Sequence, residues 1–376
     1  MRVVNNGNQF HVYDNSVKLF NGLPCGVFQV EFDEMTGYSL SQHEPMEINE
    51  KVYGVHGDKV AKVLKSFEAF NRSLGVILSG DKGIGKSLFA KLLCIEAMKK
   101  QYPVVICNGF TPGIAQFIDS MDQQMLVLFD EFDKTFKSNE RNDTQAQMLS
   151  LFDGVSMNKK LFCITCNSLS GLNDFLVNRP GRFHYHFRFE YPDQAQIEQY
   201  MTDNVPEEKH SEIKKVIDFA KKVQLNYDCL RAIAFELKIC DTFEEAISDL
   251  NIVRDSYGSN TNIYVCFADG ERFKDNGTID FFDDDEENWY MGENSPAECD
   301  YLDVTFTPSD GVWSDEFGGY FIPVNKLKVK DRTHLTDPKR EIDETRKEFM
   351  QKHLAKDVVG VVLRRNIARS TLHYYT

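Results

Sequence analysis

The sequence predicts an α/β protein: a parallel sheet, a helical subdomain after it, and small β-rich appendages at both ends. Short apolar runs such as SLGVILSG and MLVLFDEFD alternate with helix-like segments in the first half of the chain. Such alternation is typical of a buried parallel sheet. Residues 194–250 then show only helical patterning, and short strand-like runs occupy both ends.

The first appendage covers residues 1–52. GVFQVEFDEMTGYSLSQ reads as two extended runs around a turn at Met35-Thr36-Gly37. A helix is predicted from Gly57 to about Ser73, because apolar residues recur there at helical spacing. These residues are Val60, Val63, Leu64, Phe67 and Phe70.

An α/β core is predicted over residues 53–193. Its strands are SLGVILSG, PVVICN, MLVLFDEFD, KLFCITCN and HYHFRFEYP. Helices are expected at GIAQFIDSM and TQAQMLSLF, and directly after GDKGIGKS. The last of these helices should turn Leu88, Leu92, Leu93 and Ala97 inward.

Two further parts follow the core. A helical subdomain is predicted for residues 194–258, from AQIEQYM, SEIKKVIDFAKKV, DCLRAIAFEL and EEAISDL. Residues 259–376 are predicted to form a β-rich C-terminal domain, with strands at NIYVCFAD, YLDVTFTP, GGYFIPVNKLKV and VVGVVLRR. One helix is expected to start at Asp337-Pro338, where Asp can cap and Pro suits the first position.

Charge is distributed unevenly along the chain, whose formal net charge is −15. Residues 271–316 hold fifteen acids and two bases, including the acidic run Asp283–Glu287, which we interpret as a solvated loop. Residues 326–369 hold thirteen bases and seven acids. The overall charge argues against a protein that binds polyanions by default.

The cysteines and the termini indicate a cytoplasmic protein with reduced thiols. There are nine cysteines, no signal-peptide core and no apolar run of membrane-spanning length. Cys163 and Cys166 form the one CxxC pair. Strand alternation should send their side chains to opposite faces, which disfavours a shared metal and favours a structural role.

Residues 80–87, Gly80-Asp81-Lys82-Gly83-Ile84-Gly85-Lys86-Ser87, match G-x-x-x-x-G-K-[ST]. In this motif the backbone N–H groups of a loop between strand and helix surround a phosphate. Lys86 would reach the β and γ oxygens, and the Ser87 hydroxyl would coordinate Mg²⁺. The preceding apolar strand and the following helix supply the context that the motif needs.

The apolar strand LVLF ends in two carboxylates, Asp130 and Glu131. Open α/β sheets bind ligands at this carboxyl edge. Asp130 would hold Mg²⁺, and Glu131 would act as the general base for an attacking water. Asp133 fits this pattern less well and is interpreted as an exposed residue. A nucleoside triphosphate bound with Mg²⁺ is therefore predicted at this site; the resemblance described next implies that this nucleotide is ATP.

From about Tyr53 to Leu250 the sequence resembles the AAA+ ATPases, and most closely the classical AAA subgroup. The match rests on the two phosphate motifs, on MLSLFDG, and on ITCNSLSGLNDFLVNRPGRFHYHFRFEYPD, which is similar to that subgroup's second region of homology. The resemblance implies an Mg-dependent ATPase with a P-loop NTPase core and a helical lid subdomain. It also places the adenine near Tyr53-Gly54-Val55.

The resemblance further implies roles for four residues. Asn167 matches the sensor 1 residue that places the attacking water. Arg179 and Arg182 match the arginine fingers, which act on the site of a neighbouring subunit. Arg231 matches a sensor 2 arginine, which many classical members lack. A second departure is His184, where the family usually has Asp.

Fingers that act between subunits imply a homo-oligomeric ring, most often a hexamer. Family members commonly thread substrates past an aromatic residue that follows the second strand. In this sequence that residue is Phe110, in NGFTPG. An equally good interpretation is that Phe110 covers the edge of the core. We therefore predict a remodeller of protein partners. The compact core with its own β-rich ends also resembles stand-alone ATPases encoded by bacteriophages.

Two other functions remain open at this point. A nucleic-acid motor or loader would use the basic tail, where Arg364, Arg365 and Arg369 lie near Tyr374 and Tyr375. A nucleotide-gated assembly or scaffold would use the acidic run as a docking surface. No membrane association is predicted for any of the three.

Overall fold

The computed structural model describes residues 1–48, 51–53, 56–136, 138–139, 142–153, 159–173, 175–177, 179–252, 259–291, 302–331 and 357–366. The chain divides into two compact units. The first is Met1–Asn204 with Leu225–Ala232, and the second is Val205–Gln224 with Ile233–Thr376. The division falls inside the predicted helical subdomain, and the four predicted domain ranges stay predictions.

A seven-stranded sheet forms the centre of the first unit, in the order β11-β5-β10-β7-β6-β3-β4. Neighbouring strands are parallel except for β3 and β4. The predicted α/β fold with a mostly parallel sheet is thus confirmed. The bounds are β3 Val27–Asp33, β4 Gly37–Gln42, β5 Leu74–Ser79, β6 Val104–Cys107, β7 Met125–Phe129, β10 Lys160–Cys166 and β11 Phe183–Arg188.

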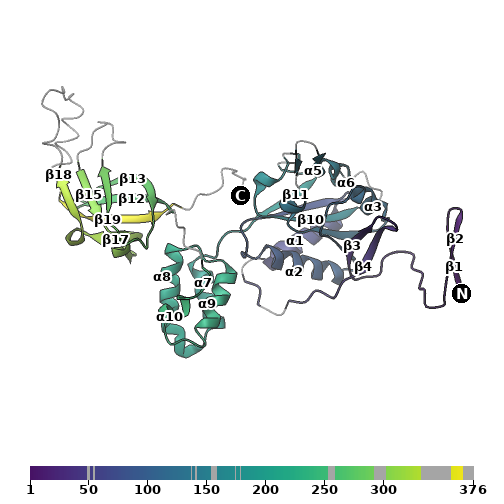
Figure 1. Cartoon of the computed structure of the whole chain (residues 1–376), viewed down its shortest axis with the longest axis horizontal. Coiled ribbons are helices and arrows are strands. Elements are labelled where there is room, and N and C mark those ends of the chain that lie inside the picture. Colours follow the sequence, from purple (N-terminus) through teal and green to yellow (C-terminus); the bar gives the residue numbers. More distant parts are fainter. Residues whose placement is uncertain are drawn as a thin grey trace, which may run out of the picture. The chain divides into compact units, whose positions relative to one another are not determined.

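Helices cover both faces of this sheet (Figure 1). α1 His56–Ala69 and α2 Lys86–Lys99 pack on one face, and α3 Ile114–Ser120 and α6 Leu149–Phe152 pack on the other. Every residue of β5, β6, β7 and β10 is buried, as a sheet covered on both faces requires.

Cys163 and Cys166 belong to different layers of the core. Cys163 packs with the α1 and α2 side, and Cys166 with the opposite side, as strand alternation predicts. Burial raises the pKa of the Cys166 thiol to about 12 and raises that of Cys163 as well. Both thiols are therefore protonated at neutral pH, in keeping with a structural role.

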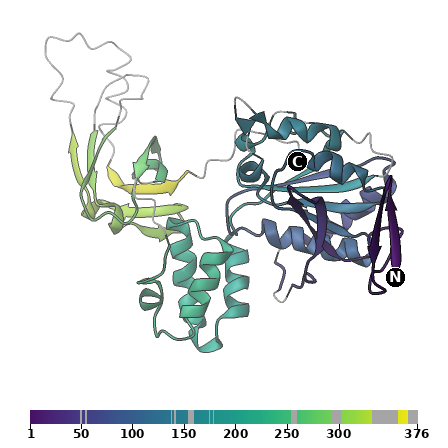
Figure 2. The same cartoon turned by 45° about the vertical axis from the view of Figure 1, so that its right-hand side comes forward.

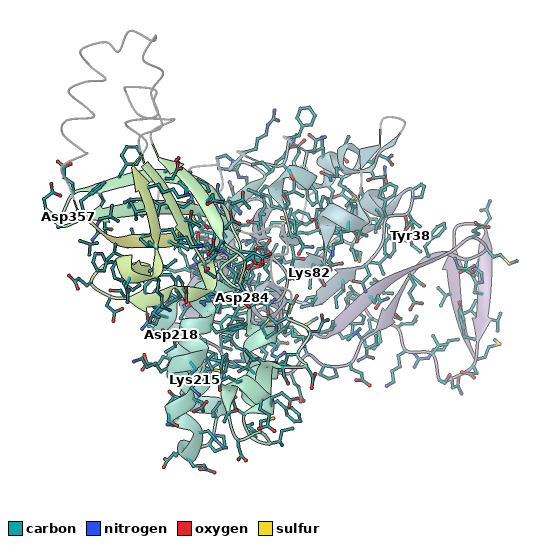
Figure 3. All side chains as sticks on the ribbon, turned by 60° about the vertical axis from the view of Figure 1, so that its left-hand side comes forward. Tyr38, Lys82, Lys215, Asp218, Asp284 and Asp357 are labelled. Atoms are coloured by element: carbon teal, nitrogen blue, oxygen red, sulfur yellow. The ribbon has the colours of Figure 1, made fainter. Side chains whose placement is uncertain are left out.

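β3 and β4 add two strands to the edge of the core sheet. β3 pairs in parallel with β6, and Val27 lies opposite Val104. Tyr38 of β4, labelled in Figure 3, donates through its hydroxyl to the carbonyls of Thr111 at 2.9 Å and Pro112 at 3.1 Å. The N-terminal segment thus contacts the loop that follows β6. The sequence did not predict this contact. β1 Arg2–Asn6 and β2 Gln9–Tyr13 form a hairpin of their own.

The predicted helix TQAQMLSLF is two single turns, α5 Thr144–Gln147 and α6. Gln145 explains the break. Its side chain is buried, and its amide donates to the carbonyl of Gly171 and accepts from the N–H of Asn173. Tertiary hydrogen bonds therefore hold the first turn in place of a continuing helix. The first unit also contains α4 Phe132–Thr135, α7 Gln194–Asn204, β8 Ser138–Asn139 and β9 Asn142–Asp143.

The second unit combines helices with two antiparallel sheets, of order β13-β12-β19-β17-β16 and β14-β15-β18. In Figure 2 the yellow strand β19 runs within the larger sheet. The bounds are α8 Ile213–Lys222, α10 Phe243–Ile247, β12 Ser259–Phe267, β13 Arg272–Ile279, β14 Glu287–Met291, β15 Leu302–Phe306, β16 Val312–Ser314, β17 Gly319–Pro323, β18 Lys328–Asp331 and β19 Val358–Arg365. α9, Tyr227–Glu236, crosses from the first unit into the second.

The sequence did not reveal β13 and β14, which are rich in polar residues. It also read GGYFIPVNKLKV as one strand, whereas β17 and β18 lie in different sheets. The helix expected at Asp337-Pro338 lies outside the described residues. None of the described helices is long and apolar enough to span a bilayer.

α8 packs against the strands of its own unit. The Tyr320 hydroxyl donates to the carbonyl of Asp218 at 2.8 Å, and the Lys221 ammonium lies 4.3 Å from the centre of the Trp313 ring. Figure 3 labels Asp218 on this helix, and Asp284 in the turn between β13 and β14. Residues 283–286 of the acidic run thus lie in the turn between β13 and β14, and Glu287 begins β14.

Candidate nucleotide-binding site

A pocket of about 430 Å³ opens in the first unit beyond the carboxyl ends of β5, β7 and β10. Open α/β sheets bind ligands at this edge. Its lining combines basic, acidic and aromatic side chains: Lys51, Tyr53, His56, Lys82, Lys86, Ser87, Lys91, Asp130, Glu131, Thr165, Asn167, Tyr200, Tyr227, Asp228 and Arg231, with Gly83, Gly85 and Leu88.

The loop of residues 80–87 connects β5 to α2 and has left-handed backbone at three glycines. Their φ values are 139° at Gly80, 74° at Gly83 and 100° at Gly85. A Cβ at Gly80 would also lie 2.5 Å from the carbonyl oxygen of Phe189. The glycines thus permit a tight turn that leads into the 14-residue helix α2. The N–H groups at the start of this helix form a site suited to a phosphate.

Lys86 is the first residue of α2 and is 7% exposed. Its ammonium donates to the carbonyls of Gly80 and Asp81, and to Oδ1 of Asn167 at 3.1 Å. Burial lowers its pKa, while nearby acidic groups oppose the shift. A cation held in this way is suited to contact phosphate oxygens that enter the loop.

Asp130 and Glu131 follow the end of β7, as predicted, and both line the pocket. Glu131 forms an ion pair with Lys134, one turn further along α4. The hydrogen bond from Lys134 lowers the pKa of the Glu131 carboxyl. Glu131 is therefore ionised at neutral pH, the state that a general base needs.

Asn167 follows the end of β10 and also lines the pocket. Its N–H donates to Oδ2 of Asp133 at 3.0 Å, and the N–H of Ser168 donates to the same oxygen at 3.4 Å. Asp133, which the sequence analysis interpreted as an exposed residue, is half-buried and holds the Asn167 backbone in place.

The start of α9 is bonded to the phosphate loop. The N–H of Tyr227 donates to the carbonyl of Gly83 at 2.9 Å, and the side-chain amide of Asn226 donates to the carbonyl of Lys82 at 3.2 Å. Arg231 lines the pocket from the same helix and forms an ion pair with Asp228. Its sensor 2 role stays a prediction.

Three tyrosines from distant parts of the chain gather at the pocket. The ring of Tyr53 lies 5.1 Å from that of Tyr200 and 6.3 Å from that of Tyr227. The Tyr53 hydroxyl donates to Asp203 at 3.0 Å, and burial raises the pKa of Tyr53 to about 12. Such rings suit the flat face of a nucleobase. Gly54 and Val55, predicted beside the adenine, lie outside the described residues.

The two predicted arginine fingers differ in their surroundings. Arg179 is exposed, and its guanidinium lies 5.5 Å from the centre of the Phe175 ring. Arg182 has a side chain only 13% exposed and is paired with Asp153, with 2.8 Å between Nη2 and Oδ2. Only Arg179 presents its side chain to solvent; both finger roles stay predictions. His184 is exposed beside Phe70.

Sequence reasoning missed Thr165, Lys134, Tyr200 and Tyr227 as pocket or pocket-edge residues. Thr165 had a detectable signal, because it lies on β10 two residues before Asn167, which follows the end of that strand. The register that places it beside Asp130 requires the pairing of β10 with β7. The tyrosines of α7 and α9 carry no motif, and only folding brings them to the loop.

The donor set fits a magnesium nucleotide. Ser87 and Asp130 line the pocket beside the loop, and Mg²⁺ is commonly held by one or two protein oxygens together with phosphates and water. The described residues contain no group of three or more His, Cys, Asp or Glu side chains placed to hold a metal by themselves. The pocket can therefore hold a triphosphate. Glu131 can accept a proton beside the terminal phosphate.

Comparison with known proteins agrees with this geometry. The family described as "ATPase family associated with various cellular activities (AAA)" matches residues 76–191. The chain is 24% identical to the ATP-dependent zinc metalloprotease FtsH of Hahella chejuensis, over 48% of this chain and 31% of that protein. It is 28% identical to a putative cell division cycle ATPase of Plasmodium falciparum, over 33% and 11% of the two chains.

The yeast mitochondrial inner membrane m-AAA protease component YTA10 is also similar. It is 25% identical over 50% of this chain and 26% of its own length. The chain spans less than a third of the length of each of these relatives. The family match covers most of β5, the phosphate loop, β6, β7, β10 and β11, so residues 76–191 of this chain are similar to the AAA family of ATPases.

Proposed function

We propose that this protein binds ATP as its magnesium complex and hydrolyses it. The observation that carries the proposal is the meeting of Lys86, Asn167 and Glu131 at one edge of the sheet, beyond a glycine-rich loop that starts a helix. These are the groups that phosphoryl transfer to water needs, namely a cation at the phosphates, a polar group at the nucleophile and a base.

In the proposed reaction each residue has a separate task. The loop amides and Lys86 hold the β and γ phosphates, while Ser87 and Asp130 hold Mg²⁺, which offsets the phosphate charge when bound. Glu131 takes a proton from the attacking water, and Asn167 orients that water. Attack on the γ-phosphorus breaks its bond to the bridging oxygen and releases ADP and phosphate.

Calorimetry with ATP and magnesium, followed by turnover assays, tests this proposal. Lys86→Ala should remove measurable binding, and Glu131→Gln should keep ATP bound while turnover falls by about 10²–10⁴-fold, the usual contribution of a general base. Lys99→Ala, at the far end of α2 and paired with Glu96, is the matched control and should behave as wild type. Absence of ATP binding by the wild-type chain overturns the proposal.

We further propose that the protein works as a homo-oligomeric ring, most often a hexamer in this family, and remodels protein partners. Arg179 supports the ring, because an exposed guanidinium near the core can reach a neighbouring site. One similar protein is named as an ATP-dependent zinc metalloprotease and another as an m-AAA protease component, and both names refer to action on proteins. Faster ATP hydrolysis in the presence of proteins, but not in the presence of DNA, would support the proposed action on protein partners.

Phe110 offers a second test of remodelling. It is half-buried, and its ring lies 5.8 Å from that of Phe136, so the described conformation favours the core-edge reading. Loss of protein remodelling in Phe110→Ala, with ATP turnover intact, would assign it to the substrate path. Turnover and remodelling that fall together would assign it to the core.

The nucleic-acid alternative has less support from the described residues. Arg364 donates to the carbonyls of Gly318 and Phe317, and Arg365 donates to the carbonyl of Lys222. Both guanidinium groups are thus used within their own unit. Arg369, Tyr374 and Tyr375 lie outside the described residues.

A further inference from the structure

The hydroxyl of Thr165 lies between the two acids at the end of β7. It donates to Oδ1 of Asp130 at 2.6 Å and accepts the backbone N–H of Glu131 at 2.8 Å. Thr165 is 2% exposed. One hydroxyl therefore binds a side chain and a backbone group of consecutive pocket residues.

The direction of these two bonds follows from their chemistry. A backbone N–H can only donate, so the hydroxyl oxygen accepts from Glu131 and its own proton goes to Asp130. The acceptor at Asp130 is a carboxylate oxygen, which makes this a short, charge-assisted bond. The bond occupies Oδ1 and leaves Oδ2 of Asp130 for another partner.

The backbone at Glu131 gives the second bond its importance. Glu131 has φ of 47°, one of two left-handed non-glycine residues in the described chain. That conformation is costly for a residue with a Cβ, and the surrounding structure must hold it. The hydrogen bond from the Glu131 N–H to Thr165 restrains this backbone conformation. It thereby sets the direction in which the Glu131 side chain points.

The strand register brings Thr165 to this place. β10 pairs in parallel with β7, with Ile164 opposite Phe129. The residues that follow this pair are Thr165 on β10 and Asp130 directly after β7. Asn167 follows directly after the end of β10 and accepts a hydrogen bond from Lys86, so the end of β10 links the base, the metal-binding acid and the phosphate-binding lysine.

We propose that Thr165 is a positioning residue for ATP hydrolysis, which orients the Asp130 carboxylate toward magnesium and fixes the backbone that carries Glu131. The proposal rests on the proposed ATPase function. Thr165 acts through these two acids and has no contact with the reacting atoms in the proposal.

A packing role for Thr165 leads to a different expectation. Valine has the same shape and can fill the same buried space, but it lacks the hydroxyl. If Thr165 only fills space, Thr165→Val should be neutral and Thr165→Ser, which loses a methyl group, should be the worse variant. If the hydroxyl positions the acids, the order reverses.

The test compares Thr165→Val, Thr165→Ser and Thr165→Ala in the full chain. We expect Thr165→Val to lower kcat by about 10–100-fold, as loss of a group that orients metal ligands does. Its KM for ATP should change by only about twofold, since the loop and Lys86 are intact. The magnesium concentration for half-maximal turnover should rise. Thr165→Ser should keep most of the activity.

Thr261→Val is the matched control, because Thr261 is a fully buried strand threonine in the second unit. It should leave kcat and magnesium dependence unchanged. If Thr165→Val does not fold, the magnesium dependence of the other two variants carries the test: Thr165→Ala should raise the magnesium concentration for half-maximal turnover and Thr165→Ser should not, a difference that filling space alone does not produce. Wild-type kcat in Thr165→Val, or equal losses in the Ser and Ala variants, overturns the proposal.

Calorimetry separates this proposal from the proposed function. The gain in ATP affinity that magnesium produces can be measured without hydrolysis, and Thr165→Val should reduce that gain. A wild-type chain that binds magnesium ATP without cleaving it would contradict the ATPase proposal, yet the magnesium-linked gain would still report on Thr165. A gain equal to that of the wild type in Thr165→Val would contradict the role of Thr165.

Discussion

Arg182 and Asp153 form a two-pronged ion pair within one subunit, joined by both Nε and Nη2 of the guanidinium. The remaining Nη1 donates to the carbonyl of Phe175 at 2.8 Å. Arg179, three residues earlier, is exposed. The two arginines of one motif therefore have different physical surroundings and should respond differently to replacement.

Replacing Arg179 by Ala should abolish turnover and leave ATP binding intact. An arginine that reaches a neighbouring site commonly contributes about 10³–10⁵-fold to the rate. Mixing Arg179→Ala with Lys86→Ala should restore part of the activity, because each variant lacks a different half of a shared site. Mixtures that show no recovery over a range of ratios would contradict a site shared between subunits.

Replacing Arg182 by Ala should act on stability. The Arg182 side chain is mostly buried, whereas the Asp153 side chain is 41% exposed. Solvent screening at Asp153 therefore reduces the stabilisation that the ion pair provides. We expect a loss of about 1–2 kcal/mol in the free energy of unfolding, from lost charge-assisted hydrogen bonds. A lower urea midpoint at an unchanged slope would show it. Wild-type stability together with lost turnover would instead assign Arg182 to catalysis.

Gly83→Ala should weaken ATP binding. A Cβ there would lie 2.7 Å from both Asn226 Nδ2 and Asp228 Oδ2, so these two side chains at the start of α9 would have to move away from the loop. We expect an affinity loss of about tenfold by calorimetry. Gly270→Ala is the control, because Gly270 also has positive φ and meets nothing within 4 Å. An equal affinity in Gly83→Ala and wild type would show that the loop does not need α9.

Lys134→Met should move the acid limb of the pH–rate profile to higher pH. Lys134 lowers the pKa of Glu131, and the base works only when ionised. Without the ammonium the Glu131 pKa rises, so activity is lost earlier as pH falls. Steady-state rates across acidic pH measure the shift, and Lys99→Met is the control. An unmoved acid limb would mean that a group other than Glu131 titrates there.

Gly171→Ala should lower turnover by disturbing Asn167. A Cβ at Gly171 would lie 2.9 Å from Cβ of Asp133, whose carboxylate binds the Asn167 backbone. We expect a lower kcat with ATP affinity largely kept, since Lys86 and its loop are untouched. Gly57→Ala, with open space around the added Cβ, is the control. Unchanged kcat would show that the Asp133 contact can shift without consequence.

The local features of this protein followed from its sequence. The glycine spacing and Lys86 marked the phosphate loop, and the apolar run before Asp130 marked the strand tip. Strand alternation placed Cys163 and Cys166 on opposite faces. These features are encoded within a few consecutive residues, so side-chain period and backbone freedom suffice to predict them.

The tertiary structure decided which distant residues meet. It joined β3 and β4 to the core sheet, placed Thr165 between Asp130 and Glu131, and turned Arg182 toward Asp153. Strand register and the packing of separate segments produce these contacts, and no local pattern of the sequence records them. The residue types that the chemistry needs can thus be read from the sequence, whereas their mutual distances come from long-range pairing.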